Sequence, residues 1–125
     1  MKFESVEDLV IPFLRQFVAV RVATQTPNPR PESFVQVRRT GGAAMNRVVE
    51  RAQLTVTAWA KSEQAAEALA IICRAGFLNH YTDMKVVRRV EETGGLYYNP
   101  DPETGLPRYT FTVTLTVRAP RSPLT

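Results

Sequence analysis

The chain of 125 residues is poor in the residue types that most often build active sites and cross-links. It has one cysteine and one histidine, so an internal disulfide and a metal site made of several such residues are excluded. Its longest apolar run covers only residues 68–73, far too short to cross a bilayer. The N-terminus is acidic where a signal peptide would be apolar. We therefore expect a protein that stays in a cytoplasm-like compartment, with no membrane partner.

The side chains that could act as nucleophiles or bases lie in patterns typical of structural roles. Cys73 falls on the apolar stripe of a predicted helix, where a thiol is usually inert packing. His80 lies just past the end of the same helix, where a histidine is more often a surface or capping residue. The serines occur at predicted caps and loops, without the Gly-x-Ser-x-Gly pattern of a nucleophile elbow. These positions predict no catalytic residue.

Cofactor and metal signals are equally weak. The glycine pairs at 41–42 and 94–95 lack the lysine and the spacing of a phosphate-binding loop. Asp101 and Glu103 resemble part of a calcium loop, but the neighbouring prolines and the short spacing argue against one. We therefore expect no enzyme activity, no cofactor and no metal.

What the chain does contain is the composition of an ordinary globular domain, with 44% hydrophobic and 22% charged residues. We expect one domain over residues 1–125, with residues 119–125 as a frayed tail.

The net charge of +4 comes entirely from the first 62 residues, which hold nine basic and five acidic side chains. A basic patch can attract nucleic acid or an acidic protein surface. A solvated arm is the simpler interpretation. Four of the basic residues lie close together, namely Arg38, Arg39, Arg47 and Arg51.

The strongest pattern is the alternation of apolar and polar residues over 47–60. A period of two is typical of a half-buried strand and not of an amphipathic helix. Residues 34–40 are also strand-like, and residues 41–46 indicate a flexible connection. The sequence therefore predicts one long antiparallel hairpin over residues 34–60, with a tip that projects from the core. Such an arm is more often an assembly device than a catalytic one. Its inward side carries Val48, Ala52, Leu54, Val56, Ala58 and Ala60, interrupted by Glu50.

The remaining segments predict an α+β fold with a mainly antiparallel sheet and two helices on one face. The expected order is helix, three strands, helix, and two or three strands. Four threonines of the last strand face outward and would lie beside Thr55 and Thr57 if the two long strands pair. The expected elements are a helix over 6–17 interrupted by Pro12, a strand over 18–24, a proline-rich loop over 26–31, a helix over 63–79, a strand over 84–90 that ends near Gly94 and Gly95, a turn over 99–105, and a strand over 108–118.

The second helix is apolar around much of its circumference, which indicates cover on more than one side. We expect one stripe to lie on the sheet, formed by Leu69, Ile72, Cys73, Gly76 and Phe77. The first helix or a neighbouring subunit could cover a second apolar flank, and both alternatives are open. The flank consists of Ala68, Ile71, Ala75 and Leu78. Trp59, on the polar side of its strand, is either a subunit-interface anchor or a side chain shielded by a loop of its own chain.

This layout resembles the tail-terminator proteins of long-tailed bacteriophages, and those of phages infecting actinobacteria most of all. The resemblance covers residues 4–118 and depends on the order of elements: a short opening helix, the hairpin Val37-Arg-Arg-Thr-Gly-Gly42, the run over 47–60, the helix capped by Ser62, and a long closing strand. Head–tail adaptor proteins of similar size are the nearest alternative.

The resemblance implies a structural virion protein that forms a ring, usually of six subunits. Such a ring caps the tail tube and joins the tail to the head at the head–tail junction, after assembly in the host cytoplasm. The implied partners are further copies of the chain, the tail tube protein and the head connector or adaptor protein. The hairpin arm, including Gly41, Gly42 and the four arginines, would contact the tube, the connector or the passing DNA, the last without sequence specificity. A small nucleic-acid-binding module is the alternative from another functional class.

Overall fold

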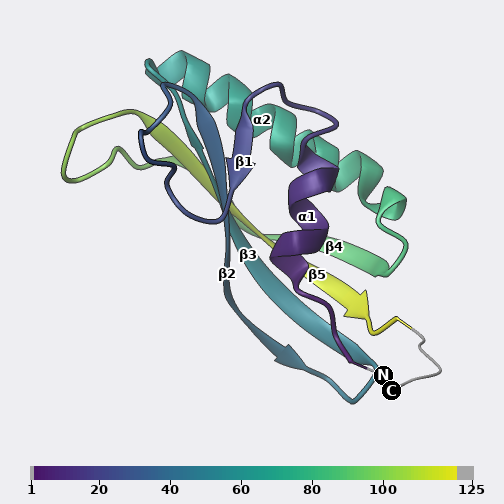
Figure 1. The fold of residues 1–125 in the computed structure, drawn as a ribbon. Helices are drawn as coiled ribbons and strands as arrows, with labels where there is room; N and C mark the ends of the chain where they lie inside the picture. Colours follow the sequence, from purple (N-terminus) through teal and green to yellow (C-terminus); the bar gives the residue numbers. More distant parts are fainter. Residues whose placement is uncertain (1, 121–125) are drawn as a thin grey trace.

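The computed structural model describes residues 2–120 as two layers, a five-stranded sheet with both helices of that range on one face (Figure 1). The expected α+β class with a mostly antiparallel sheet is confirmed. The elements in chain order are α1 (Val6–Leu14), β1 (Arg21–Ala23), β2 (Phe34–Ala44), β3 (Val49–Trp59), α2 (Glu63–His80), the 3-10 turn η1 (Tyr81–Asp83), β4 (Val87–Tyr98) and β5 (Arg108–Arg118).

The strand order across the sheet is β1-β2-β3-β5-β4, so the last strand of the chain lies between β3 and β4. Only the short pairing of β1 with β2 is parallel. The register places Thr55 opposite Thr112 and Thr57 opposite Thr110, with hydroxyl oxygens 3.4 and 3.3 Å apart. The threonine side chains therefore lie on one face, as the alternation predicted, and this open face is the one that carries no helix.

Both helices pack on the other face and share one core with it. The ring of Phe77 in α2 lies 5.7 Å from Phe13 in α1 and 6.1 Å from Phe111 in β5. Alternate residues of β3 and β5 supply the sheet side of this core. Burying one such apolar side chain contributes about 1.5–3 kcal/mol, so this layer is the main source of stability. The fully buried side chains of β3 and β5 are Ala52, Leu54, Val56, Ala58, Phe111, Val113 and Leu115.

The N-terminal elements are shorter than predicted. Helix α1 contains Pro12 and ends at Leu14 instead of residue 17, where the chain closes through tight turns. The N–H of Phe17 donates to the carbonyl of Leu14, and so does that of Val18. Val18 therefore belongs to the turn that follows the helix, and strand β1 covers only three residues of the predicted 18–24.

The hairpin also differs from its prediction. Residues 41–44 are not a flexible connection, because β2 continues through them past a bulge between Arg39 and Gly41. The hairpin does not stand off the core, since β3 pairs with β5 along its entire length from Val49 to Trp59. Only the turn over residues 45–48 lies beyond these paired strands. Its Asn46 side-chain oxygen accepts hydrogen bonds from the N–H groups of Val48 and Val49, both at 2.9 Å.

Two further differences concern the C-terminal half. Strand β4 does not end near Gly94 and Gly95 but continues to Tyr98, and register shifts take up the irregularity. Ala119, expected in a frayed tail, is buried and donates its N–H to the Val48 carbonyl at 2.8 Å. Residues 121–125 of the expected tail lie outside the described part of the chain.

Candidate interaction surface

The most distinctive surface is the side of α2 that faces away from the sheet. The hydroxyl oxygen of Ser62 accepts from the N–H of Ala65 at 3.1 Å and fixes the start of the helix. Small side chains then allow the inner side to approach the sheet closely. The buried residues are Ala66, Ala70, Cys73, Gly76 and Phe77. The outer side, which we name the α2 flank, consists of Ala68, Ile71, Ile72, Ala75 and Leu78, all exposed.

The second flank is exposed among residues 2–120, so its cover by a neighbouring subunit stays a prediction, and the assignment of Ile72 to the stripe on the sheet is wrong. Ile71, Ile72 and Leu78 are 47%, 45% and 42% exposed. Alanines at 66 and 70 take inner positions, and both are fully buried.

The first helix does not cover the α2 flank. The segment after α1 packs on another side of α2, where a Cβ at Gly76 would come within 2.9 Å of the Phe17 ring. Phe17 also stacks on His80, with ring centroids 5.4 Å apart. The sequence analysis left two possible covers for this flank, the first helix and a neighbouring subunit. Among residues 2–120 the first helix is therefore excluded.

Charged groups border the flank. Arg74 makes a two-point contact with Glu92 of β4, with nitrogen–oxygen distances of 2.5 and 2.9 Å. The hydrogen bond and the charge of Glu92 raise the pKa of Arg74. At the N-terminal end of α2, the Tyr109 hydroxyl donates to Glu63 at 3.3 Å. Burial, followed by the negative charges of Glu67 and Glu63, raises the pKa of Tyr109. This end of the flank is therefore acidic.

The arginines assigned to the hairpin arm do not form one cluster. Arg39 lies on the helix-covered side, 2.8 Å from the carboxylate of Glu50, which is why an acidic residue can interrupt the apolar alternation there. Its backbone N–H also donates to Glu7 of α1 at 2.9 Å. Arg38 and Arg51 lie on the open face, and Arg47 lies in the turn. Gly41 and Gly42 are strand residues next to the bulge.

The structure brings Arg51 next to residues that sequence reasoning had not placed with it. Because β5 lies between β3 and β4, Thr116 has Arg51 on one side and Arg89 on the other. Both guanidinium groups reach Glu91, at 3.3 and 3.4 Å. A hollow of about 450 Å³ lies nearby, lined by residues 42–45, Arg51 and threonines of β4 and β5. The sequence indicates only that alternate residues of a strand share a face. The strand order must be known before that alternation places Arg51 beside Arg89.

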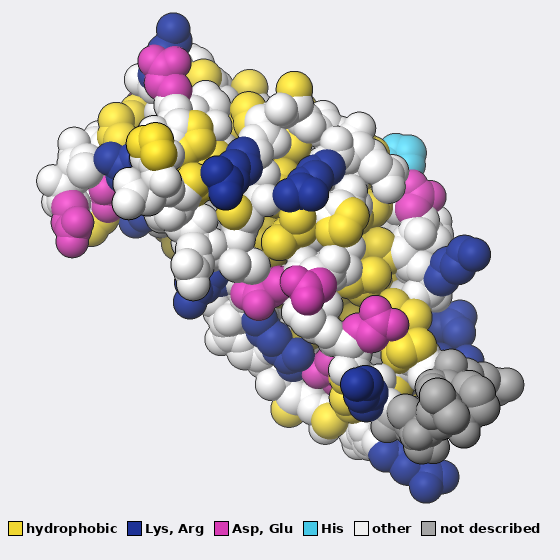
Figure 2. All heavy atoms as spheres, in the orientation of Figure 1, with side chains coloured by type: hydrophobic (Ala, Val, Ile, Leu, Met, Phe, Trp, Pro, Cys, Tyr) yellow, Lys and Arg dark blue, Asp and Glu magenta, His cyan; other side chains and the backbone are white. Residues whose placement is uncertain are grey.

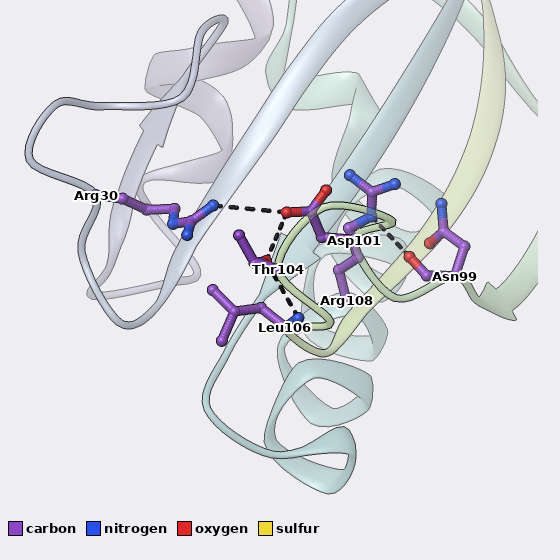
Figure 3. Close-up of polar contacts among 6 residues, drawn as sticks. All are labelled: Arg30, Asn99, Asp101, Thr104, Leu106 and Arg108. Carbon is purple, nitrogen blue, oxygen red and sulfur yellow. Dashed lines mark hydrogen bonds and ion pairs between the residues drawn. The ribbon is translucent and has the colours of Figure 1, made fainter.

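Trp59 is 5% exposed and is shielded by its own chain, so the role of exposed interface anchor does not apply to it. Its ring stacks on Phe34 at 5.2 Å, with the guanidinium groups of Arg30 and Arg108 at 5.2 and 5.0 Å from its centroid. Figure 3 shows that the loop which carries Arg30 contacts the loop before β5, since Arg30 lies 3.8 Å from Asp101.

The polar contacts in this corner are otherwise local to the loop before β5. Arg108 donates to the Asn99 carbonyl at 2.6 Å, and the Thr104 hydroxyl donates to Asp101 at 2.6 Å (Figure 3). The hydrogen bond from Thr104 is the main cause of a lowered pKa for Asp101. The indole nitrogen of Trp59 is buried and has no hydrogen-bond partner within residues 2–120.

Cys73, the nucleophile considered from the sequence, is buried in the core. Burial raises the pKa of the Cys73 thiol to about 12, so it is protonated at neutral pH. Within this range no three His, Cys, Asp or Glu side chains are grouped as metal ligands. A hollow of about 670 Å³ lies between the N-terminal segment, α1 and residues 83–85, and Ser5 in its lining caps α1. None of the described helices is long and apolar enough to span a bilayer.

No family model matches the chain, and no curated protein is significantly similar to it. The indications of function in this chain therefore come from its surfaces, the α2 flank and the open face of the sheet.

Proposed function

We propose that the protein is a structural subunit that closes into a ring with copies of itself and serves as the tail terminator of a long-tailed phage. The observation that carries this proposal is the α2 flank. Seven large hydrophobic residues are exposed among residues 2–120, and three of them lie together on this flank, namely Ile71, Ile72 and Leu78. An apolar area of this kind on one helix favours a protein partner, because isolated exposed side chains need no explanation but a contiguous group does.

A ring is favoured over a symmetric dimer because the molecule has differentiated sides. Helices cover one face of the sheet, and threonines and arginines line the other. Subunits that associate through two different surfaces continue to add until a rotation closes the ring. A closed ring has two ends with different side chains, as a protein between a tail tube and a head requires.

The remaining parts of the proposal rest on the resemblance of element order. They are a ring of six subunits, the tail tube protein and the head connector as partners, and the head–tail junction of the virion as the location, after assembly in the host cytoplasm. A head–tail adaptor would form a similar ring but would bind the connector and not the end of the tail tube.

The test compares the wild type with Ile71→Asp and with Gln64→Asp, which adds the same charge at an exposed position outside the apolar group. Light scattering and negative-stain images should show a ring for the wild type and Gln64→Asp, and a monomer for Ile71→Asp. The rings should bind the ends of purified tail tubes. A wild type that is monomeric at every concentration and salt tested, and that does not bind tubes, would contradict the proposal.

A second candidate function is binding to the phosphate backbone of DNA through the open face. The observation that favours it is the grouping of Arg51 and Arg89 across β5, with Arg118 at the end of the same strand. Such binding should weaken steeply with salt, in proportion to the number of phosphates contacted. Fluorescence anisotropy with a random-sequence duplex should show weaker binding for Arg89→Gln than for Arg21→Gln, an exposed residue of β1. No binding of the wild type at low salt would remove this candidate.

A further inference from the structure

We propose that the hairpin turn of one copy fills the α2 flank of the next, with Met45 packed against Ile71 and Leu78 and Arg47 paired with Glu67. The proposal rests on the ring proposed above and names the two surfaces that form its joints. Residues 43–47, which we name the turn knob, are the part of the chain that would enter the flank.

The turn knob joins the end of β2 to the turn beyond the paired strands, and it carries a large apolar side chain. Met45 is 63% exposed, the highest value among the exposed large hydrophobic residues of the described range. Alanines at 43 and 44 beside it are also exposed. An unbranched thioether side chain adapts its shape to irregular apolar surfaces such as a helix flank.

The backbone that presents Met45 is already ordered by hydrogen bonds. The N–H of Met45 donates to the Val49 carbonyl at 2.8 Å, and the side-chain oxygen of Asn46 accepts from the N–H groups of Val48 and Val49. Insertion of a pre-formed turn costs less conformational entropy than ordering a free loop. The knob is therefore suited to docking as a rigid element.

The charges beside the two apolar surfaces are complementary. Arg47 follows Met45 by two residues at the knob, and Glu67 precedes Ile71 by one helical turn on the flank. Arg39, Arg51 and Arg74 each form an ion pair within the chain, whereas neither Arg47 nor Glu67 does so among residues 2–120. Glu67 lies beside the Tyr109 hydroxyl but forms no ion pair in that range, so it and Arg47 can meet when Met45 reaches Ile71.

The position of the two surfaces requires that they come from different copies. In Figure 1 the hairpin turn lies at the lower end of the molecule, and α2 crosses the upper part. At that lower end, hydrophobic and basic side chains both reach the surface (Figure 2). Contact between knob and flank is therefore head to tail, the type of joint that closes a ring.

The decisive experiment mixes two variants that each lack one surface. Met45→Asp has a damaged knob and an intact flank, whereas Ile71→Asp has the reverse. Each should be monomeric alone at concentrations where the wild type forms rings. Their mixture should give a one-to-one heterodimer in native mass spectrometry, because only one productive joint exists. Met45→Leu, which keeps an apolar knob, should still form rings, and circular dichroism should show the native fold for all three.

The charge pair has a separate test. Arg47→Glu and Glu67→Arg should each weaken assembly by about tenfold in the dissociation constant. The double variant should recover most of that loss, because the exchanged charges attract again across the joint. No recovery would overturn the assigned pairing.

The outcomes separate this inference from the proposed ring. If Met45→Asp forms rings as readily as the wild type, the knob is not in the joint and the inference is wrong, while the ring proposal stands. If Met45→Asp forms dimers through the flank alone, the flank pairs with itself and the head-to-tail joint is also wrong. A monomeric wild type would overturn both.

Discussion

At the scale of single residues, Gly42 shows how strongly one position can constrain the hairpin. Its φ of +91° lies in a region that side chains with a Cβ rarely adopt, and a Cβ there would come within 2.0 Å of the Arg51 carbonyl oxygen. Gly42→Ala should therefore lower the free energy of unfolding by about 1–3 kcal/mol. Gly95→Ala is the control, because a Cβ at Gly95 meets nothing within 4 Å. Urea denaturation followed by the fluorescence of the single tryptophan measures both changes. Equal effects would contradict the role of Gly42.

Cys73 gives a prediction about reactivity. Burial raises the pKa of its thiol to about 12, so only a minute fraction is thiolate at pH 7–8, and the core also blocks access. The native protein should not react with Ellman's reagent over hours, whereas in concentrated guanidinium chloride it should release one equivalent of product. The matched control is Gln64→Cys, which places a second thiol at an exposed position outside the α2 flank and should release one equivalent within minutes without denaturant. Rapid reaction of native Cys73 would show that the core around α2 opens readily.

At the scale of elements, Trp59 joins two loops to the end of the central hairpin. Arg30 comes from the loop before β2 and Arg108 from the start of β5, and both lie over the same indole ring. Trp59→Ala should cost about 3–5 kcal/mol, because it removes a buried aromatic side chain that holds both loops. Trp59→Phe should cost only about 1 kcal/mol, because it keeps the stacking on Phe34 and removes an indole nitrogen that has no partner. Thermal unfolding followed by circular dichroism tests the order of these two effects.

The loop before β5 should respond to acid. The folded pKa of Asp101 is lowered, chiefly by the Thr104 hydrogen bond, so its ionised form favours the folded loop. This contribution is present above the ordinary carboxyl pKa of 3.8 and is lost as the pH falls through the lower folded value. An NMR titration should show Asp101 titrating below 3.8, and Thr104→Val should move its pKa upward. A pKa unchanged in Thr104→Val would contradict this cause.

The parts of the fold that follow local patterns could be predicted from the sequence, and those set by non-local pairing could not. Alternation predicted the inward residues of β3 and β5, and helical spacing predicted that Cys73, Gly76 and Phe77 lie on the inner side of α2. The length of β2 could not be predicted, because the glycines at 41 and 42 are typical of turns and here serve a bulge. The proximity of Arg51 and Arg89 depends on β5 lying between their strands, and no local signal reports that order. The role of Trp59 stayed open for the same reason, since Arg30 and Arg108, which shield its ring, are distant from it in the chain.

At the scale of the whole molecule, assembly and stability should be linked. A subunit that buries the α2 flank only in a ring gains stability from its partners, and mass action makes that gain depend on concentration. The melting temperature of the wild type should therefore rise when the protein concentration is raised a hundredfold, whereas that of Ile71→Asp should stay constant. At the lowest concentration, where rings dissociate, the two should melt at nearly the same temperature, because position 71 is 47% exposed in the monomer. Differential scanning fluorimetry across a dilution series tests this link, and a wild-type melting temperature independent of concentration would show that the flank remains uncovered.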